Sequence, residues 1–181
     1  MIFREIGLSG AYLIEPERLE DDRGFFARAW CEDEFAAHGL SARFVQGNVS
    51  FNKRRGTVRG MHFQIAPHEE TKLVRCTRGA MYDVIIDLRP TSPTFKRSIG
   101  VELSAETRRS LYIPGGFAQG FQSLADDTEV LYHMGTFYSP AHARGVRWND
   151  PAFSVRWSLP ISCIAKRDSE YPDFRPEILQ G

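Results

Sequence analysis

Short apolar runs separated by turn residues recur along most of the chain. The apolar runs at residues 73–76 and 80–88 are separated by Thr77, Arg78 and Gly79, which predicts a strand, a turn and a second strand. Gly, Pro, Asp or Asn residues separate six further β-prone runs, at residues 43–45, 99–103, 110–113, 120–124, 129–134 and 153–157. Strands at this spacing are typical of an all-β sandwich or barrel.

Helical signals are scarce. Residues 33–38 begin with acidic side chains and are followed by Gly39, which suits the position just after a helix. No internal repeat or Ser/Gly-rich linker divides the chain, and 181 residues is a usual size for one domain. We therefore predict a single all-β domain over residues 1–181 with a few short helices.

The C-terminal segment differs in composition from the rest of the chain. From Cys163 onward it is rich in proline and charge. We expect its last part, about residues 169–181, to be loosely ordered or packed on a partner subunit.

Composition and charge narrow the classes of function. Hydrophobic residues make up 42% and charged residues 25%, as in an ordinary soluble globular protein. The 23 Lys and Arg residues balance 23 Asp and Glu residues, so no net field attracts nucleic acid or an anionic membrane. We expect neither as a partner, and an anionic ligand requires a local cluster of Arg or Lys.

Cysteine usage and the uncharged segments indicate the compartment. Cys31, Cys76 and Cys163 are odd in number and lack C-x-x-C spacing, which favours neither a disulfide framework nor a cysteine zinc site. The N-terminus lacks the apolar core of a signal peptide, and the longest uncharged run, residues 110–125, contains Pro114 and three glycines. We expect a cytoplasmic protein that spans no membrane.

Two short segments concentrate candidate chemistry: residues 59–64, Arg-Gly-Met-His-Phe-Gln, and residues 72–75, Lys-Leu-Val-Arg. If the first is extended, His62 and Gln64 point to one face and Met61 to the other. A histidine in the mouth of a barrel is a candidate general base. The alternative is a core histidine held by hydrogen bonds.

Further motifs follow one another along the chain. Together with the two segments above, they lie at residues 22–26 (Asp-Arg-Gly-Phe-Phe), 45–50 (Val-Gln-Gly-Asn-Val-Ser), 59–64, 72–75, 83–89 (Asp-Val-Ile-Ile-Asp-Leu-Arg), 113–118 (Ile-Pro-Gly-Gly-Phe-Ala) with 120–121, and 148–151 (Trp-Asn-Asp-Pro). With these motifs in this order, the chain resembles the dTDP-4-dehydrorhamnose 3,5-epimerase family. The resemblance runs from about residue 10 to residue 168, and it implies an antiparallel jelly-roll β-sandwich or barrel of the cupin type.

The substrates of this family are nucleotide-linked 4-keto-6-deoxy sugars, in which the C4 ketone acidifies the protons on C3 and C5. Epimerisation needs a base on one face of the sugar, a proton donor on the other, and a group that stabilises the enolate oxygen. The resemblance implies His62 as the base, Asp168 as its orienting carboxylate, Lys72 beside the enolate oxygen and Tyr132 as the acid. We expect no cofactor.

Each of these residues has a plainer alternative. Asp168 follows Lys166 and Arg167 and could be a surface acid in a charged tail. Tyr132 could be a strand aromatic that fills the core. Lys72 could be a solvated lysine on an edge strand.

The resemblance also implies a nucleotide site that two subunits share. Arg suits pyrophosphate because its planar fork donates two hydrogen bonds while staying charged; the alternative for the arginines is surface charge or salt bridges. The implied arrangement is a homodimer with exchanged N-terminal strands. The implied binding residues are Arg23 and Phe26 from the neighbouring subunit, and Arg59, Gln46, Asn48 and the pocket residue Tyr138.

A metal site of the cupin type is not expected. Its usual ligands are two histidines in H-x-H spacing, a carboxylate a few residues later, and a third histidine. Those places hold His62 and Gln64, the segment at residues 69–72, and Gln119. One imidazole and at most one carboxylate make a poor transition-metal site, so we predict metal-free catalysis.

Two residues depart from the family pattern. Gln119 stands where the family carries a histidine, which leaves open whether C3, C5 or both are inverted. Arg28 stands where many members carry Glu near the nucleotide base. A donor such as Arg suits N3 of cytosine better than N3–H of thymine, which leaves open CDP or dTDP. The alternative is that Arg28 points into solvent.

We therefore expect an epimerase of a nucleotide-linked 4-keto-6-deoxy sugar. One alternative is an enzyme that inverts only C3 or only C5, on a CDP-linked sugar. Another is a cupin that binds a nucleotide sugar without catalysis. A metal-dependent isomerase or dioxygenase is a third, which the missing histidines disfavour.

Overall fold

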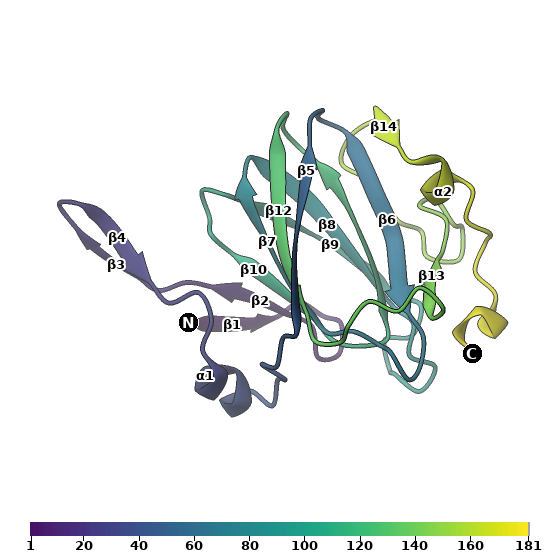
Figure 1. Cartoon of the computed structure of the whole chain (residues 1–181), viewed down its shortest axis with the longest axis horizontal. Coiled ribbons are helices and arrows are strands. Elements are labelled where there is room, and N and C mark those ends of the chain that lie inside the picture. Colours follow the sequence, from purple (N-terminus) through teal and green to yellow (C-terminus); the bar gives the residue numbers. More distant parts are fainter. Residues whose placement is uncertain (181) are drawn as a thin grey trace.

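The computed structural model describes residues 1–180, and it is a sandwich of two β-sheets (Figure 1). The first sheet has the order β1 (Ile2–Glu5), β2 (Tyr12–Glu15), β10 (Ser110–Ile113), β7 (Lys72–Arg78), β12 (Thr128–Met134) and β5 (Gln46–Asn52). The second has the order β13 (Ala143–Gly145), β6 (Thr57–Gln64), β11 (Phe117–Ser123), β8 (Ala80–Asp87) and β9 (Ser98–Ser104), and β14 (Cys163–Ile164) pairs in parallel with β6. The predicted all-β sandwich is confirmed.

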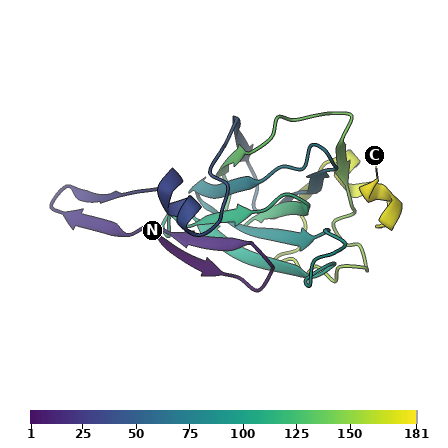
Figure 2. The same cartoon turned by 90° about the horizontal axis from the view of Figure 1, so that it is seen from below.

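Successive strands cross repeatedly from one sheet to the other, since β5, β7, β10 and β12 belong to the first sheet and β6, β8, β11 and β13 to the second. Within each sheet the main pairs are antiparallel. A separate hairpin of β3 (Arg18–Asp21) and β4 (Gly24–Ala27) stands away from the sandwich (Figures 1 and 2). The helices are short: α1 (Glu32–Ala37), α2 (Lys166–Ser169) and the 3-10 turn η1 (Pro176–Leu179).

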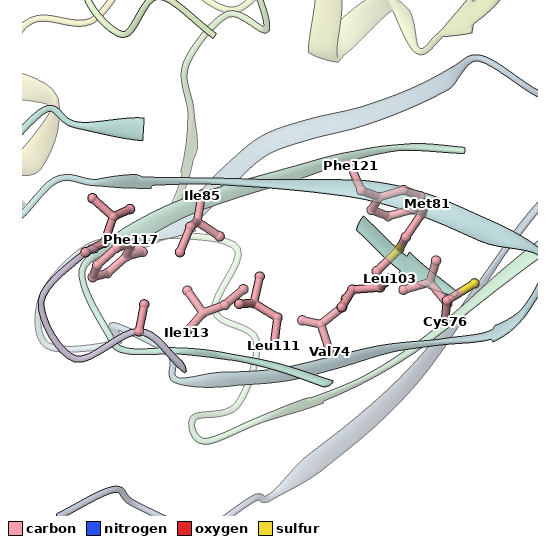
Figure 3. Packing of buried hydrophobic residues seen from close by; sticks show 12 residues of the cluster. Val74, Cys76, Met81, Ile85, Leu103, Leu111, Ile113, Phe117 and Phe121 are labelled. Atoms are coloured by element: carbon pink, nitrogen blue, oxygen red, sulfur yellow. The ribbon is translucent and has the colours of Figure 1, made fainter. Parts of the chain in front are cut away.

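The main core fills the space between the sheets (Figure 3). Alternation along β7 turns Val74 and Cys76 inward, whereas Leu73 packs on the outer face against Phe35 of α1. Strand β8 is buried on both faces, because Ile85 faces the first sheet and Ile86 faces an outer cluster. A strand covered on both sides shows a nearly continuous apolar run, which explains the pattern of residues 80–88.

The C-terminal segment packs on its own chain. Phe174 is buried against Phe153, with 5.2 Å between the ring centroids, and its backbone N–H donates to the Asp150 carboxylate. Arg147 forms an ion pair with Asp173 at 2.6 Å. The Phe174 side chain thus completes the outer core of its own chain. The expected loose order of residues 169–181, or their packing on a partner subunit, stays a prediction.

Most predicted strands are confirmed with shifted ends, and two were wrong. Residues 43–45 lie outside the ladder, which begins at Gln46, because Phe44 packs on the outer cluster against Phe35 of α1 instead of within a strand. Residues 153–157 form no strand: they cover the second sheet, and Ser154 has φ +50°. The helix predicted at 33–38 lies at Glu32–Ala37, and Gly39 follows it with φ +68°. Strands β1 to β4 were not predicted.

No helix within residues 1–180 has both the length and the apolar character needed to cross a membrane.

The packing of Phe174 in the C-terminal segment leads to a prediction about stability. Truncation of Phe174 to Ala removes the buried ring between Phe153 and Phe95, and we expect it to lower the free energy of unfolding by about 3 kcal/mol. The exposed Phe137 is the matched control, and Phe137→Ala should change this free energy by less than about 0.5 kcal/mol. Urea denaturation measures both. Equal effects for the two variants would contradict the packing of the tail.

Candidate active site

A cavity of about 550 Å³ opens between the two sheets. Strands β5, β7 and β12 form the wall from the first sheet, and β6, β11 and β13 form the wall from the second. The C-terminal segment adds a third side. The lining residues that the argument uses are Gln46, Asn48, Arg59, His62, Gln64, Glu70, Lys72, Gln119, Tyr132, Tyr138, Arg167 and Tyr171.

A bulge in β6 aims the side chains of this strand. His62 pairs with Gln119 and Arg59 pairs with Phe121, so that Gly60 and Met61 together stand opposite the single residue Gly120. Strict alternation would turn Arg59 and His62 to opposite faces, but the extra residue brings both to the cavity. Only glycine fits at position 60, since φ is +130° and a Cβ there would lie 2.4 Å from Gly120 Cα.

His62 and Asp168 form a hydrogen-bonded pair on this bulge. Nε2 of His62 lies 2.8 Å from Oδ1 of Asp168, and the backbone N–H of Gly60 donates to Oδ2 at 3.1 Å. Burial raises the pKa of Asp168, but the bonds from His62 and Gly60 and the charge of Arg167 hold it below its usual value. An ionised carboxylate only accepts hydrogen bonds, so Nε2 of His62 carries the proton and Nδ1 is left as the basic nitrogen.

Tyr132 lies on the opposite wall. It belongs to β12 in the first sheet, whereas His62 belongs to β6 in the second, and both line the cavity. Burial raises the pKa of the Tyr132 hydroxyl, against the opposing positive charge of Arg59. A phenol kept protonated across the cavity from an imidazole can donate a proton to the face opposite that base.

Lys72 lies between two polar partners at the start of β7. Its Nζ is 3.1 Å from Oε1 of Glu70 and donates to Oε1 of Gln119 at 3.4 Å. All three residues line the cavity, and both Lys72 and Glu70 are buried. The ammonium is therefore a localised positive charge at the cavity wall, suited to a developing oxyanion.

The predicted nucleotide residues of this chain lie on one side of the cavity. Gln46 donates to Asn48 at 3.1 Å, and it accepts a hydrogen bond from the backbone N–H of Tyr138 at 3.2 Å. Arg59 donates from Nε to Asn52 at 2.7 Å and from a terminal nitrogen to the Phe51 carbonyl at 3.2 Å. These contacts fix the guanidinium at the rim, where it can meet an anion.

Arg23, Phe26 and Arg28 do not line the cavity of their own chain. Arg23 pairs with Asp21 at the tip of the hairpin, and its side chain is 89% exposed. Phe26 is 70% exposed on β4. Arg28 donates to Glu34 at 2.8 Å. The structure thus separates the hairpin residues from the other predicted site residues.

Sequence reasoning missed several cavity residues. Arg167 and Tyr171 come from α2 and the turn that follows it, and the Tyr171 ring lies edge-on to His62 at 5.9 Å. No periodicity marks them, because they reach the cavity through the docking of the tail. Glu70 precedes a strand and has no pattern of its own. Asp83 lies outside the cavity lining but bonds to Gln119, and it was visible as an acid inside the apolar run 80–88.

Within residues 1–180 no cluster of three or more His, Cys, Asp or Glu side chains is arranged to hold a metal ion. The polar neighbours of His62 on the wall are the amides Gln64 and Gln119, which are poor ligands for a transition metal. Metal-free catalysis stays a prediction.

Comparisons with known proteins identify the family. The family profile of dTDP-4-dehydrorhamnose 3,5-epimerase matches residues 5–176. A protein of that name from Sinorhizobium fredii is 39% identical over 175 residues, which cover 96% of this chain and 90% of the relative. A dTDP-4-dehydrorhamnose 3-epimerase from Streptomyces niveus is 36% identical, over 94% of this chain and 82% of the relative.

A crystal structure of the 3,5-epimerase from Bacillus anthracis, with TDP and pyrophosphate bound, has a TM-score of 0.91 and 40% identity. The match covers 96% of this chain and 99% of that one. Similarity of sequence and fold over nearly the whole length leads to one conclusion: this chain belongs to the dTDP-4-dehydrorhamnose 3,5-epimerase family.

Proposed function

We propose that the protein epimerises a dTDP-linked 4-keto-6-deoxy sugar at C3 and C5. The observation that carries this proposal is the placement of the His62–Asp168 pair and Tyr132 on opposite walls of one cavity, with the Lys72 ammonium also at its surface. These are the three groups that inversion next to a ketone requires.

Nδ1 of His62 takes the proton from the carbon beside the C4 ketone, and the C–H electron pair moves to form the enolate. Lys72 stabilises the negative charge on the C4 oxygen. The Tyr132 hydroxyl then gives its proton to the opposite face of the same carbon, and the enolate electrons return. His62 releases its proton to solvent and Tyr132 regains one, so the sugar changes configuration without change in composition. Asp168 stabilises the imidazolium in between.

Gln119 supports a second candidate, an epimerase that acts at one carbon only. Its amide lines the cavity, and an amide neither takes nor gives a proton at neutral pH. The S. niveus relative is named for inversion at C3 alone. Hydrogen exchange with solvent at both C3 and C5 of the sugar, or at one of them alone, distinguishes the two candidates.

We infer that dTDP is the nucleotide and that two chains share each site. The relatives are named for dTDP sugars, and TDP is bound in the B. anthracis structure. Strand β5 is the edge of the first sheet, where Val49 and Phe51 are exposed, and the hairpin exposes Leu19, Phe25 and Phe26. An exposed strand edge beside an apolar hairpin suits exchange between two identical chains.

We also propose a reducing, cytoplasmic setting. Cys31, Cys76 and Cys163 form no disulfide in the described chain, and Cys163 is exposed.

Deuterium exchange tests the proposed reaction. We expect NMR in deuterated water to show solvent deuterium at both C3 and C5 of the dTDP-4-keto-6-deoxy sugar. Incorporation at C3 or C5 alone would identify the single-position enzyme. A protein that binds the sugar nucleotide and incorporates none would be a binding protein without this activity.

The same assay tests the roles of His62 and Asp168. His62→Ala should lower the exchange rate by about 10³-fold, and Asp168→Asn should keep the fold and lose a large part of the rate, because the imidazole loses its orienting acceptor. His68→Ala is the matched control, since this histidine stacks on His142 outside the cavity lining. Wild-type exchange in His62→Ala would refute the assignment.

Mixed dimers test the exchanged hairpin. We expect light scattering to give a mass of twice 20.6 kDa, and we expect Arg23→Ala and His62→Ala each to have low activity when expressed alone. Chains coexpressed in equal amounts should regain about a quarter of wild-type activity, because half of the dimers then hold one intact site.

Arg59→Ala coexpressed with His62→Ala is the control, since both residues line the same cavity of one chain and no site becomes intact. A fully active monomer, or no recovery with Arg23→Ala, would exclude a shared site.

Calorimetry tests the nucleotide. Arg28 is paired with Glu34 outside the cavity lining of its chain, so we expect dTDP to bind at least about tenfold more tightly than CDP in both wild type and Arg28→Glu. Tighter binding of CDP by the wild type, reversed in Arg28→Glu, would instead give Arg28 the role of reading the base.

A further inference from the structure

Asp83 is a buried acid with an incomplete set of partners. It lies on β8 with no exposed surface, beside the core residues Met81, Ile85 and Phe121. Its Oδ1 accepts a hydrogen bond from Nε2 of Gln119 at 2.9 Å, whereas Oδ2 has no hydrogen-bond partner in the described chain. A buried polar oxygen without a partner costs stability, so a purely structural role explains this aspartate poorly.

The bond to Asp83 decides the orientation of the Gln119 amide. An amide has a donor end and an acceptor end. Because the Gln119 nitrogen faces Asp83, its carbonyl oxygen faces Lys72, whose Nζ lies 3.4 Å away. Glu70 holds the same ammonium from another direction at 3.1 Å. An ammonium has three donors, so one N–H is left to point at a ligand in the cavity.

We propose that Asp83 is a positioning residue that acts through Gln119: it fixes the amide, and the amide oxygen holds the Lys72 ammonium where the enolate oxygen of the sugar forms. The inference rests on the proposed function, since it needs Lys72 to stabilise the enolate. It deepens that function by assigning a buried residue, outside the cavity lining, to the geometry of the oxyanion site.

The neutral amide suits this task electrostatically. Glu70 already balances the charge of Lys72, and a second carboxylate in direct contact would compete with the enolate for the ammonium. Burial raises the pKa of Asp83 to about 7, against the Gln119 bond and the Lys72 charge. A carboxyl group that is partly neutral can be replaced by the isosteric amide of Asn, which still offers Gln119 an acceptor.

We call the contacts from Asp83 through Gln119 to Lys72 the relay, and steady-state kinetics with paired variants test it. Asp83→Val and Gln119→Met remove the acceptor and the amide, and each should lower kcat by about tenfold to a hundredfold with KM within about threefold of wild type, because the lost contact acts on the enolate. Asp83→Asn should keep kcat within about threefold. The double variant Asp83→Val with Gln119→Met should be no slower than the slower single variant, within about twofold.

Stability separates this role from a structural one. Asp83→Val removes a buried carboxyl that lacks a full set of partners, so its Tm should equal or exceed that of wild type. Asp87, also fully buried on β8, is the matched control: Arg89, Ser92 and Thr94 all bond to it, and Asp87→Asn should lower Tm and leave kcat unchanged. Should Asp83→Val fail to fold, Asp83→Ala replaces it under the same expectations.

A readout that needs no turnover keeps the inference separate from the proposed function. In ¹⁵N-labelled protein, the Lys72 ammonium signal, identified by its loss in Lys72→Arg, should be sharp in wild type and Asp83→Asn. It should broaden in Asp83→Val and Gln119→Met.

Wild type without epimerase activity but with this pattern of signals would reject the function and keep the relay. An active wild type would reject the relay alone if kcat of Asp83→Val stays within twofold, if the two losses multiply in the double variant, or if the ammonium signal is unchanged.

Discussion

The contact of Asp168 with the bulge of β6 holds the candidate site together. Oδ1 meets His62 and Oδ2 meets the Gly60 amide, so one carboxylate joins a side chain and the backbone of the same strand across 106 and 108 residues of sequence. The Gly60 N–H turns toward the tail because the bulge takes it out of the regular ladder with β11. Docking of the tail therefore also fixes the orientation of the imidazole. Phe174 anchors the tail in the outer core.

The two sheets of the sandwich place the imidazole of His62 and the phenol of Tyr132 on opposite walls of the cavity. Strands that cross from sheet to sheet place His62 on β6 in the second sheet and Tyr132 on β12 in the first, with the cavity between them. A flat ligand between two sheets meets one group on each face, which is the geometry that inversion demands. The antiparallel ladders hold both walls in place, so the separation of His62 and Tyr132 is a property of the fold.

The sequence predicts the parts of this protein that depend on local pattern. Strands such as residues 110–113 and 129–134 alternate or cluster apolar side chains, and they form where the pattern puts them. Strand β5 escaped detection although Gln46, Asn48 and Ser50 alternate with Gly47, Val49 and Phe51. Its polar half lines the cavity and its apolar half is exposed, which is the reverse of an ordinary half-buried strand. Residues 153–157 were wrongly predicted as a strand, since a segment that covers a sheet is as apolar as a strand.

The same distinction between local pattern and tertiary packing applies to the site residues. His62 and Gln64 could be placed on one face from strand periodicity alone, and both line the cavity. Arg167 and Tyr171 could not, because no period relates a tail helix to a strand a hundred residues earlier. The bulge at Gly60 was also invisible, although it decides that Arg59 shares the face of His62. Long-range docking and register shifts depend on tertiary packing, which a single sequence does not state.

Two buried carboxylates, Asp168 and Asp83, stand in different relations to His62 and Lys72. Asp168 touches His62 directly, and in the proposed mechanism its charge favours the imidazolium that forms when His62 takes a proton. Asp83 is separated from Lys72 by the Gln119 amide, so under the proposed role it orients the ammonium without forming an ion pair with it. In the proposed mechanism, a base that gains a charge is served by contact with an anion, and Lys72, which Glu70 already balances, is served by a neutral second neighbour. One side chain inserted between an acid and a lysine thus changes the electrostatic role of the acid while the strands around it keep the same ladder.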